Sequence, residues 1–123
     1  MPSGKREQAR IERRLIAALT RACETAKSEI VGFCWLTHEV DYARFADSLQ
    51  IIWVFDTQAS KDQAMAGGQD QRMVQLTAQA LEDAGLEVAQ IAGCVYFDSE
   101  EQCQRDHDGN WQKRILRTYV KRG

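Results

Sequence analysis

The sequence predicts a single α+β domain, a two-layer sandwich in which helices cover an antiparallel three-stranded sheet. Its length of 123 residues suits one hydrophobic core. Apolar residues recur at helical spacing over residues 11–30 and 60–84. Three shorter runs have the alternation or the β-branched and aromatic composition of strands. We therefore predict the order α-β-β-α-β-α within one domain, residues 1–123, with the basic ends 1–8 and 112–123 as candidate flexible segments.

The first segment, residues 11–30, is predicted to be a long amphipathic helix. Its apolar residues are three or four positions apart, which places them on one side of a helix. They are Ile11, Leu15, Ala18, Leu19, Ala22, Cys23, Ala26 and Ile30. The same geometry places the arginines of this region on a sector nearly opposite the apolar one. Gly32 is expected to end the helix.

Residues 33–42 and 49–55 are predicted to be two strands. In the first, two sets of side chains alternate, so that they would lie on opposite faces of a strand: Cys34, Leu36, His38, Val40 and Tyr42 on one, and Phe33, Trp35, Thr37, Glu39 and Asp41 on the other. The second is rich in β-branched and aromatic residues, and we expect Trp53 to face the core. Because only the short polar link 43–48 joins the two runs, an antiparallel hairpin is the natural connection.

The second half of the chain is predicted to contain a broken helix, a strand and a short helix. Helical spacing over residues 60–84 is interrupted at Gly67-Gly68, and we expect Leu81 to be a core residue and Gly85 to cap the helix. Residues 86–97 follow as the third strand. Ser99 then resembles the N-cap of a helix that ends near His107. After a turn at residues 108–110, the pattern over 111–120 leaves a helix, a strand and a docked tail open.

Composition excludes several classes of protein. Hydrophobic residues make up 44% and charged residues 28% of the chain, which excludes a disordered, collagen-like or disulfide-scaffold protein. No apolar run approaches the roughly 20 residues that span a bilayer, and the first residues are too polar for a signal peptide. We therefore expect a cytoplasmic protein without a membrane partner, in which the four cysteines are reduced thiols.

Charge is unevenly distributed along the chain. Residues 1–21 contain six basic and two acidic residues, and residues 112–123 contain five basic residues and no acid. The segment between them holds the other five basic and sixteen acidic residues. A basic helix face can contact phosphates. The candidate nucleic-acid-binding residues are Arg6, Arg10, Arg13, Arg14, Arg21, Lys113, Arg114 and Arg117, with Lys121 and Arg122 as extensions of the second cluster. Alternatively, these side chains solvate the surface or pair with acidic residues of the same or a neighbouring chain.

Two Cys-x3-His pairs use both histidines of the chain. Cys103 and His107 would share a helix face, but Cys34 and His38 on a strand would be about 13 Å apart. We therefore expect no metal site. The sequence also has no Walker loop, dinucleotide fingerprint or zinc-protease helix, so we expect no cofactor and rank an enzyme only third. The sequence leaves open whether any cysteine is reactive.

Three stretches resemble a family of short bacterial proteins sometimes labelled Fis-family transcriptional regulators. They are Gly32-Phe33-Cys34-Trp35-Leu36-Thr37-His38, Leu49-Gln50-Ile51-Ile52-Trp53-Val54-Phe55 and Phe97-Asp98-Ser99-Glu100-Glu101-Gln102-Cys103, the last together with Gly109-Asn110-Trp111. This resemblance covers nearly the whole chain. It implies no particular activity.

The order of elements is also similar to that of the ribosome-binding factor A family and of type II KH modules. Those proteins share an α-β-β-α-α-β order and bind RNA, which the resemblance makes an expectation for this chain. The KH signature is a Gly-x-x-Gly loop, and the corresponding stretch here is Gly67-Gly68-Gln69-Asp70. Its aspartate would repel a phosphate.

These observations together predict a non-enzymatic, cytosolic binding module. Nucleic acid, with RNA favoured, is the predicted partner of its basic helix face. The alternative is a protein–protein interaction or homo-oligomerisation module in which the same face pairs with an acidic surface. The sequence leaves the oligomeric state open.

Overall fold

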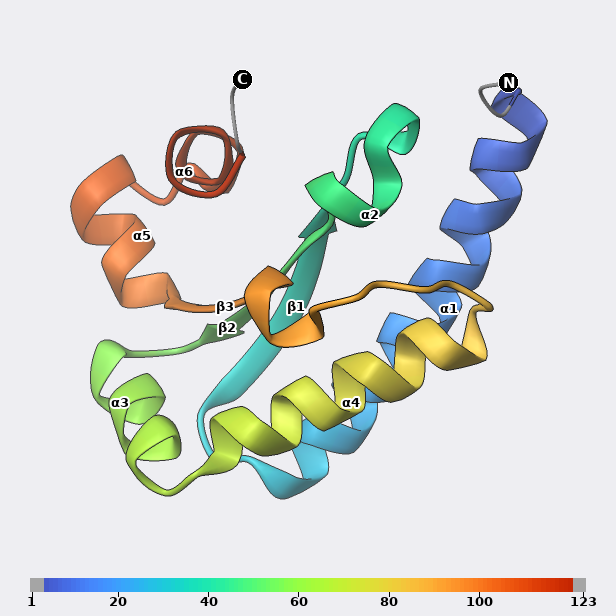
Figure 1. The fold of residues 1–123 in the computed structure, drawn as a ribbon. Helices are drawn as coiled ribbons and strands as arrows, with labels where there is room; N and C mark the ends of the chain where they lie inside the picture. Colours follow the sequence, from blue (N-terminus) through green and yellow to red (C-terminus); the bar gives the residue numbers. More distant parts are fainter. Residues whose placement is uncertain (1–3, 121–123) are drawn as a thin grey trace.

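A computed structural model describes residues 4–120 and confirms an α+β fold. Figure 1 shows a small sheet with a long N-terminal helix and a second long helix on one side of it. These two helices are α1, Lys5–Glu29, and α4, Gln69–Asp83. Gly32, with a φ of 84°, follows α1 and turns the chain into the first strand.

The sheet has the order β1-β2-β3 and is mixed, whereas the sequence pattern predicted an antiparallel one. Strand β1, Phe33–Glu39, pairs antiparallel with β2, Gln50–Phe55, as the hairpin pattern predicted. Strand β3, Val95–Ser99, pairs with β2 in parallel. The reason is the connection: two successive helices return the chain to the starting end of β2, where Ile51 pairs with Val95.

The connections around β2 contain more helix than the sequence indicated. A 3-10 turn, Tyr42–Arg44, and the short helix α2, Phe45–Ser48, join β1 to β2 in place of a simple polar link. After β2, α3 spans Gln58–Ala66 and α4 follows directly. The predicted break at Gly67-Gly68 is confirmed, since Gly68 has a φ of 80° at the start of α4.

A bulge in β1 changes which side chains share a face. The pairing shifts between Phe33 and Trp35, so two positions of β1 lie against one position of β2. Phe33 therefore faces the main core, where its ring centroid lies 5.1 Å from that of Trp53. Strict alternation along the sequence predicted that Phe33 and Leu36 lie on opposite faces. That prediction was wrong, because Leu36 also packs against the main core.

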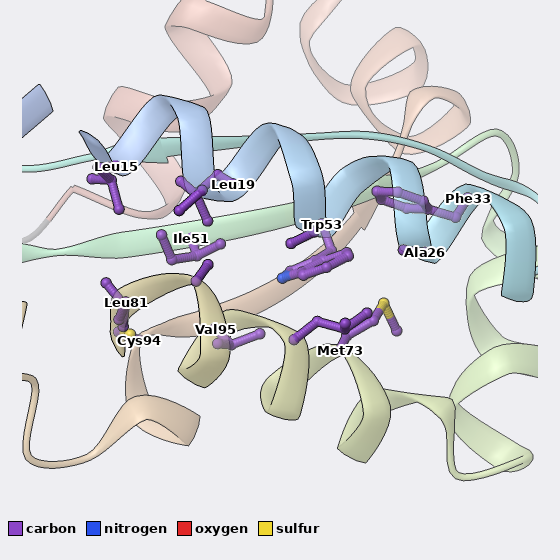
Figure 2. Packing of buried hydrophobic residues seen from close by; sticks show 14 of the residues in the cluster. Leu15, Leu19, Ala26, Phe33, Ile51, Trp53, Met73, Leu81, Cys94 and Val95 are labelled. Carbon is purple, nitrogen blue, oxygen red and sulfur yellow. The ribbon is translucent and has the colours of Figure 1, made fainter. Parts of the chain in front are cut away.

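The main core lies between β2 and the pair of long helices. Figure 2 shows Leu15 and Leu19 of α1 and Met73 and Leu81 of α4 around Ile51 and Trp53 of the sheet. Trp53 is fully buried and Leu81 is 1% exposed, which confirms both as core residues. The Trp53 indole donates a hydrogen bond of 3.1 Å to the Thr77 hydroxyl, so its polar atom is satisfied inside the core.

A second layer of helices covers the other face of the sheet, so the two-layer prediction is incomplete. Helix α5, Glu100–His107, begins at the predicted cap, where the Ser99 hydroxyl accepts a hydrogen bond from the backbone N–H of Gln102. Helix α6, Trp111–Thr118, follows the turn at residues 108–110. Ile52 and Val54, the β2 side chains that point away from α1 and α4, are fully buried on this face. Ring contacts of Trp111 with Trp35 and of Tyr119 with Tyr96 place α6 and its C-terminal end over the same face. In Figure 1 α5 and α6 lie on the side of the sheet away from α4.

Two predicted segments differ in extent from the observed ones. The third strand is much shorter than residues 86–97, because a loop and the 3-10 turn Ile91–Cys94 precede it. Residues 112–118 of the predicted flexible end belong to helix α6, and residues 5–8 of the other end belong to α1. None of the helices in the described range 4–120 is long and apolar enough to cross a membrane.

Candidate nucleic-acid interface

Helix α1 separates an apolar face from an arginine face. Its buried residues are Leu15, Ala18, Leu19, Ala22 and Ala26. All five candidate arginines of the N-terminal segment are exposed to solvent: Arg6, Arg10, Arg13, Arg14 and Arg21. At about 100° per residue they occupy a sector roughly 100° wide on the side turned away from the core. We call these five residues the arginine face. The structure thus brings this part of the predicted site together on one rigid element.

No carboxylate within residues 4–120 lies within 4.0 Å of a guanidinium of the arginine face. Two arginines elsewhere in the chain are paired, by contrast. Arg72 makes a bidentate contact with Glu29 at 2.9 and 3.0 Å, and Arg105 lies 3.2 Å from Asp106. The positive charge of the arginine face is therefore not neutralised by ion pairs within the described part of the chain.

Arg114 does not belong to an exposed basic cluster, contrary to the prediction from sequence. Only 7% of it is exposed, and its guanidinium donates hydrogen bonds of 2.6 and 2.9 Å to the two carboxylate oxygens of Asp98. The Tyr119 hydroxyl donates to the same carboxylate at 2.5 Å. A guanidinium held in this way fixes α6 to the end of β3 and is not available to a phosphate.

The other basic residues predicted for the C-terminal part of the site lie apart from the arginine face. Lys113 and Arg117 are exposed on α6, whereas Lys121 and Arg122 lie outside the described residues. Because α1 packs on the Trp53 side of the sheet and α6 on the Asp98 side, the two basic clusters lie over opposite faces. Figure 1 shows the sheet between these two helices. One continuous basic surface does not result.

A groove of about 330 Å³ runs between α1 and β1, beside the arginine face. Its lining residues are Ile16, Leu19, Thr20, Cys23, Glu24, Lys27, Leu36, Thr37 and His38. Ile16 is 47% exposed and supplies apolar surface at the rim of this groove. Burial lowers the pKa of His38, while the nearby Glu12 and Glu39 carboxylates partly oppose this shift. His38 is therefore a neutral imidazole at pH 7.

The glycine pair ahead of α4 has one property of an anion-binding nest. Gly68 has the left-handed conformation that such a nest uses. However, Arg72 in the following turn is bound to Glu29, and Asp70 places a carboxylate in the first turn of α4. The arrangement favours a helix junction over an anion site.

Three of the four cysteines lie in surroundings that disfavour a thiolate. None of the four is in a disulfide. Burial raises the pKa of the Cys34, Cys94 and Cys103 thiols, which is the opposite of what a thiolate nucleophile needs. Within residues 4–120 no three His, Cys, Asp or Glu side chains are grouped so that they could hold a metal ion.

Sequence reasoning missed two features of the site region. The ion pair between Asp98 and Arg114 joins residues of a strand and of a segment whose structure the pattern left undecided. The groove depends on how far α1 lies from β1, a distance that periodicity does not encode. For Asp98, an available signal was a carboxylate at the end of an apolar strand, since a buried charge requires a partner.

Comparisons with known proteins gave no match, whether to a protein-family model, a curated protein or a solved structure.

Proposed function

We propose that this chain is a non-enzymatic, cytosolic module that binds nucleic acid through the arginine face of α1, with RNA as the favoured partner. The observation that carries the proposal is the set of five exposed arginines on one helix, none of which has a carboxylate partner within residues 4–120. Unpaired guanidinium groups of this kind bind phosphate oxygens by charge-assisted hydrogen bonds.

The length of the arginine face suits a nucleic-acid backbone. Arg6 and Arg21 are fifteen residues apart, which corresponds to about 22 Å along a helix. Successive phosphates on such a backbone can therefore be contacted by successive turns of α1. Binding of this type gains free energy from the release of counterions and depends little on base sequence.

Two further points support RNA and the choice of α1 as its contact. Apart from the short helix α2 between β1 and β2, the order α1-β1-β2-α3-α4-β3 matches the α-β-β-α-α-β order of type II KH modules, which bind RNA. The loop that carries the KH signature is not matched here, because the α3–α4 junction contains Asp70 and no second spaced glycine. The arginine face is therefore the better candidate for the phosphate contact.

The test is a binding measurement by fluorescence anisotropy at near-physiological ionic strength. The protein is titrated separately with a short single-stranded RNA, a duplex DNA and an acidic protein. We expect measurable affinity for RNA and a clear loss of that affinity in the variant R10Q/R13Q/R14Q. Binding only to the acidic protein would replace this proposal with the interaction-module alternative. The variant R44Q/R72Q/R105Q, with the same change of net charge on other surfaces, serves as the matched control.

A further inference from the structure

We infer that the groove between α1 and β1 holds one unpaired base of a single-stranded nucleic acid whose phosphates lie along the arginine face. This inference rests on the proposed function. It assigns a ligand class, single strand over duplex, to the same site. Three features lie side by side at this site: the apolar walls of the groove, the open edge of β1 and the arginine face.

The groove combines apolar walls with accessible polar groups. Leu19, Leu36 and the half-exposed Ile16 supply apolar surface for the faces of a planar ring. His38 lines the same groove and has no hydrogen bond within residues 4–120, since its Nε2 lies 3.9 Å from the nearest Glu12 oxygen. A neutral imidazole offers one donor and one acceptor to a base edge.

Strand β1 adds a row of backbone groups. Within the described residues it pairs only with β2, so its outer N–H and C=O groups have no strand partner. The groove is lined by Leu36, Thr37 and His38 from this open edge. Backbone donors and acceptors at a strand edge can bond the Watson–Crick edge of a base that is not already paired.

The cations are placed to hold the adjoining phosphates. Arg13 is three positions before Ile16 and seven before Thr20, so it lies on the groove side of the arginine face. Arg6 lies on the same side, about two turns nearer the N-terminus. Lys27 stands in the groove together with Glu24, and the two opposite charges offset one another there. Positive charge therefore dominates only along the helix outside the groove, where a backbone would run.

The volume of the groove suits a small occupant such as one base. About 330 Å³ is at the lower end of the range for small-ligand sites. A base within a duplex would have to unpair and unstack before it could occupy the groove, and this step opposes binding. The groove should accordingly favour single strands and leave duplex binding to the arginines alone.

The experiment compares three ligands of equal phosphate number: a single-stranded RNA, an RNA duplex of half its length, and an abasic single strand that has the backbone but no bases. We expect the RNA to bind roughly tenfold more tightly than the abasic strand, because burial of roughly 55 Å² of base surface against the apolar walls of the groove is worth about that factor. Titration of 13C-methyl-labelled protein should shift the Ile16 methyl signals with RNA and leave them nearly unchanged with the abasic strand.

The variant Ile16→Ala removes the exposed wall of the groove, and Leu116→Ala, a comparable truncation on α6, is its control. Ile16 and Leu116 are 47% and 45% exposed, so both variants should fold. We expect Ile16→Ala to lose most of the preference for RNA over the abasic strand and Leu116→Ala to keep it. Equal binding of RNA and abasic strand by the unmodified protein would overturn the inference and leave the proposed function standing. No binding of any of the three ligands would overturn the proposed function itself.

Discussion

At the scale of single residues, the cluster of Asp98, Arg114 and Tyr119 holds the C-terminal helix in place. Asp98 is 1% exposed, so its charge is buried, and it accepts hydrogen bonds from both other residues. Burial and the bond to Asp98 together raise the pKa of the Tyr119 phenol, which keeps it a donor at neutral pH. The bond to Asp98 likewise raises the pKa of Arg114.

We predict that Asp98→Asn destabilises the protein by about 3–5 kcal/mol, because it removes the buried counter-charge of the Arg114 guanidinium and leaves only the partly exposed Asp106 carboxylate. Urea unfolding measures the loss. Asp106→Asn is the control, since Asp106 also contacts Arg114, at 3.3 Å, but from the exposed side. It should cost much less. Similar losses of unfolding free energy in the two variants would show that burial of the ion pair between Asp98 and Arg114 does not determine its contribution to stability.

A second residue-scale prediction concerns the pH dependence contributed by His38. Its pKa in the folded protein is lowered from 6.5, mainly by burial and against the opposing pull of Glu12 and Glu39. The unfolded chain therefore binds a proton more readily than the folded one. The stability linked to this residue is fully present above about pH 6.5 and declines as the pH falls through and below that value.

The measurement is the free energy of unfolding of the unmodified protein and of His38→Gln between about pH 8 and pH 5. The difference between the two proteins should be constant at high pH and should shift against the unmodified protein as the medium becomes acidic. A difference that does not change with pH would contradict a partly buried His38 whose pKa is lowered by burial.

The sequence predicted which residues are buried in the core better than it predicted which polar side chains contact each other. Trp53 and Leu81 could be placed because apolar periodicity reports burial directly. Arg114 was misplaced because it was grouped with neighbouring basic residues along the sequence. Its partner Asp98 is sixteen residues away, and only the docking of α6 on β3 brings the two together.

At the scale of elements, glycines with positive φ set where helices end. Gly32 and Gly85 have φ values of 84° and 73°, and each closely follows a long helix. The two differ in their surroundings. A Cβ at Gly32 would lie 2.6 Å from the Cβ of Ser60, whereas one at Gly85 would meet no atom within 4 Å.

We predict that Gly85→Ala costs about 1–2 kcal/mol, which is the strain of the left-handed conformation for a residue with a Cβ. Gly32→Ala should cost clearly more, because the Cβ of Ser60 is fixed to its own backbone and cannot rotate out of the way. Thermal or urea unfolding of the two variants provides the comparison. A larger loss at Gly85 would mean that the junction of α1, β1 and α3 is looser than the structure has it.

The sequence could predict where helices form and where they end, but it could not predict how the strands pair. The caps at Ser99 and Gly85 have local chemical causes. The parallel pairing of β3 follows from the path of α3 and α4, and the bulge in β1 accompanies the packing of Phe33 against Trp53. Both depend on contacts between distant parts of the chain.

At the scale of the whole molecule, the sheet separates two basic surfaces of different character. On one side α1 carries five arginines that are free of ion pairs in the described part of the chain. On the other side α6 uses Arg114 to anchor itself and exposes only Lys113 and Arg117 among its described basic residues. The charge asymmetry of the sequence thus becomes one strong surface, on α1. The sequence alone showed the basic residues but not that they divide between opposite faces.

The most direct test of the central claim is the salt dependence of single-stranded RNA binding. For the unmodified protein the logarithm of the association constant should fall steeply with the logarithm of salt concentration. The variant R10Q/R13Q/R14Q should flatten this slope by about 0.7 for each phosphate that it no longer neutralises, or about two units in all, with its unfolding free energy little changed. R44Q/R72Q/R105Q should keep the original slope. Equal flattening by both variants, or an affinity of the unmodified protein no tighter than about 10⁻⁴ M, would contradict the assignment of nucleic acid to the arginine face.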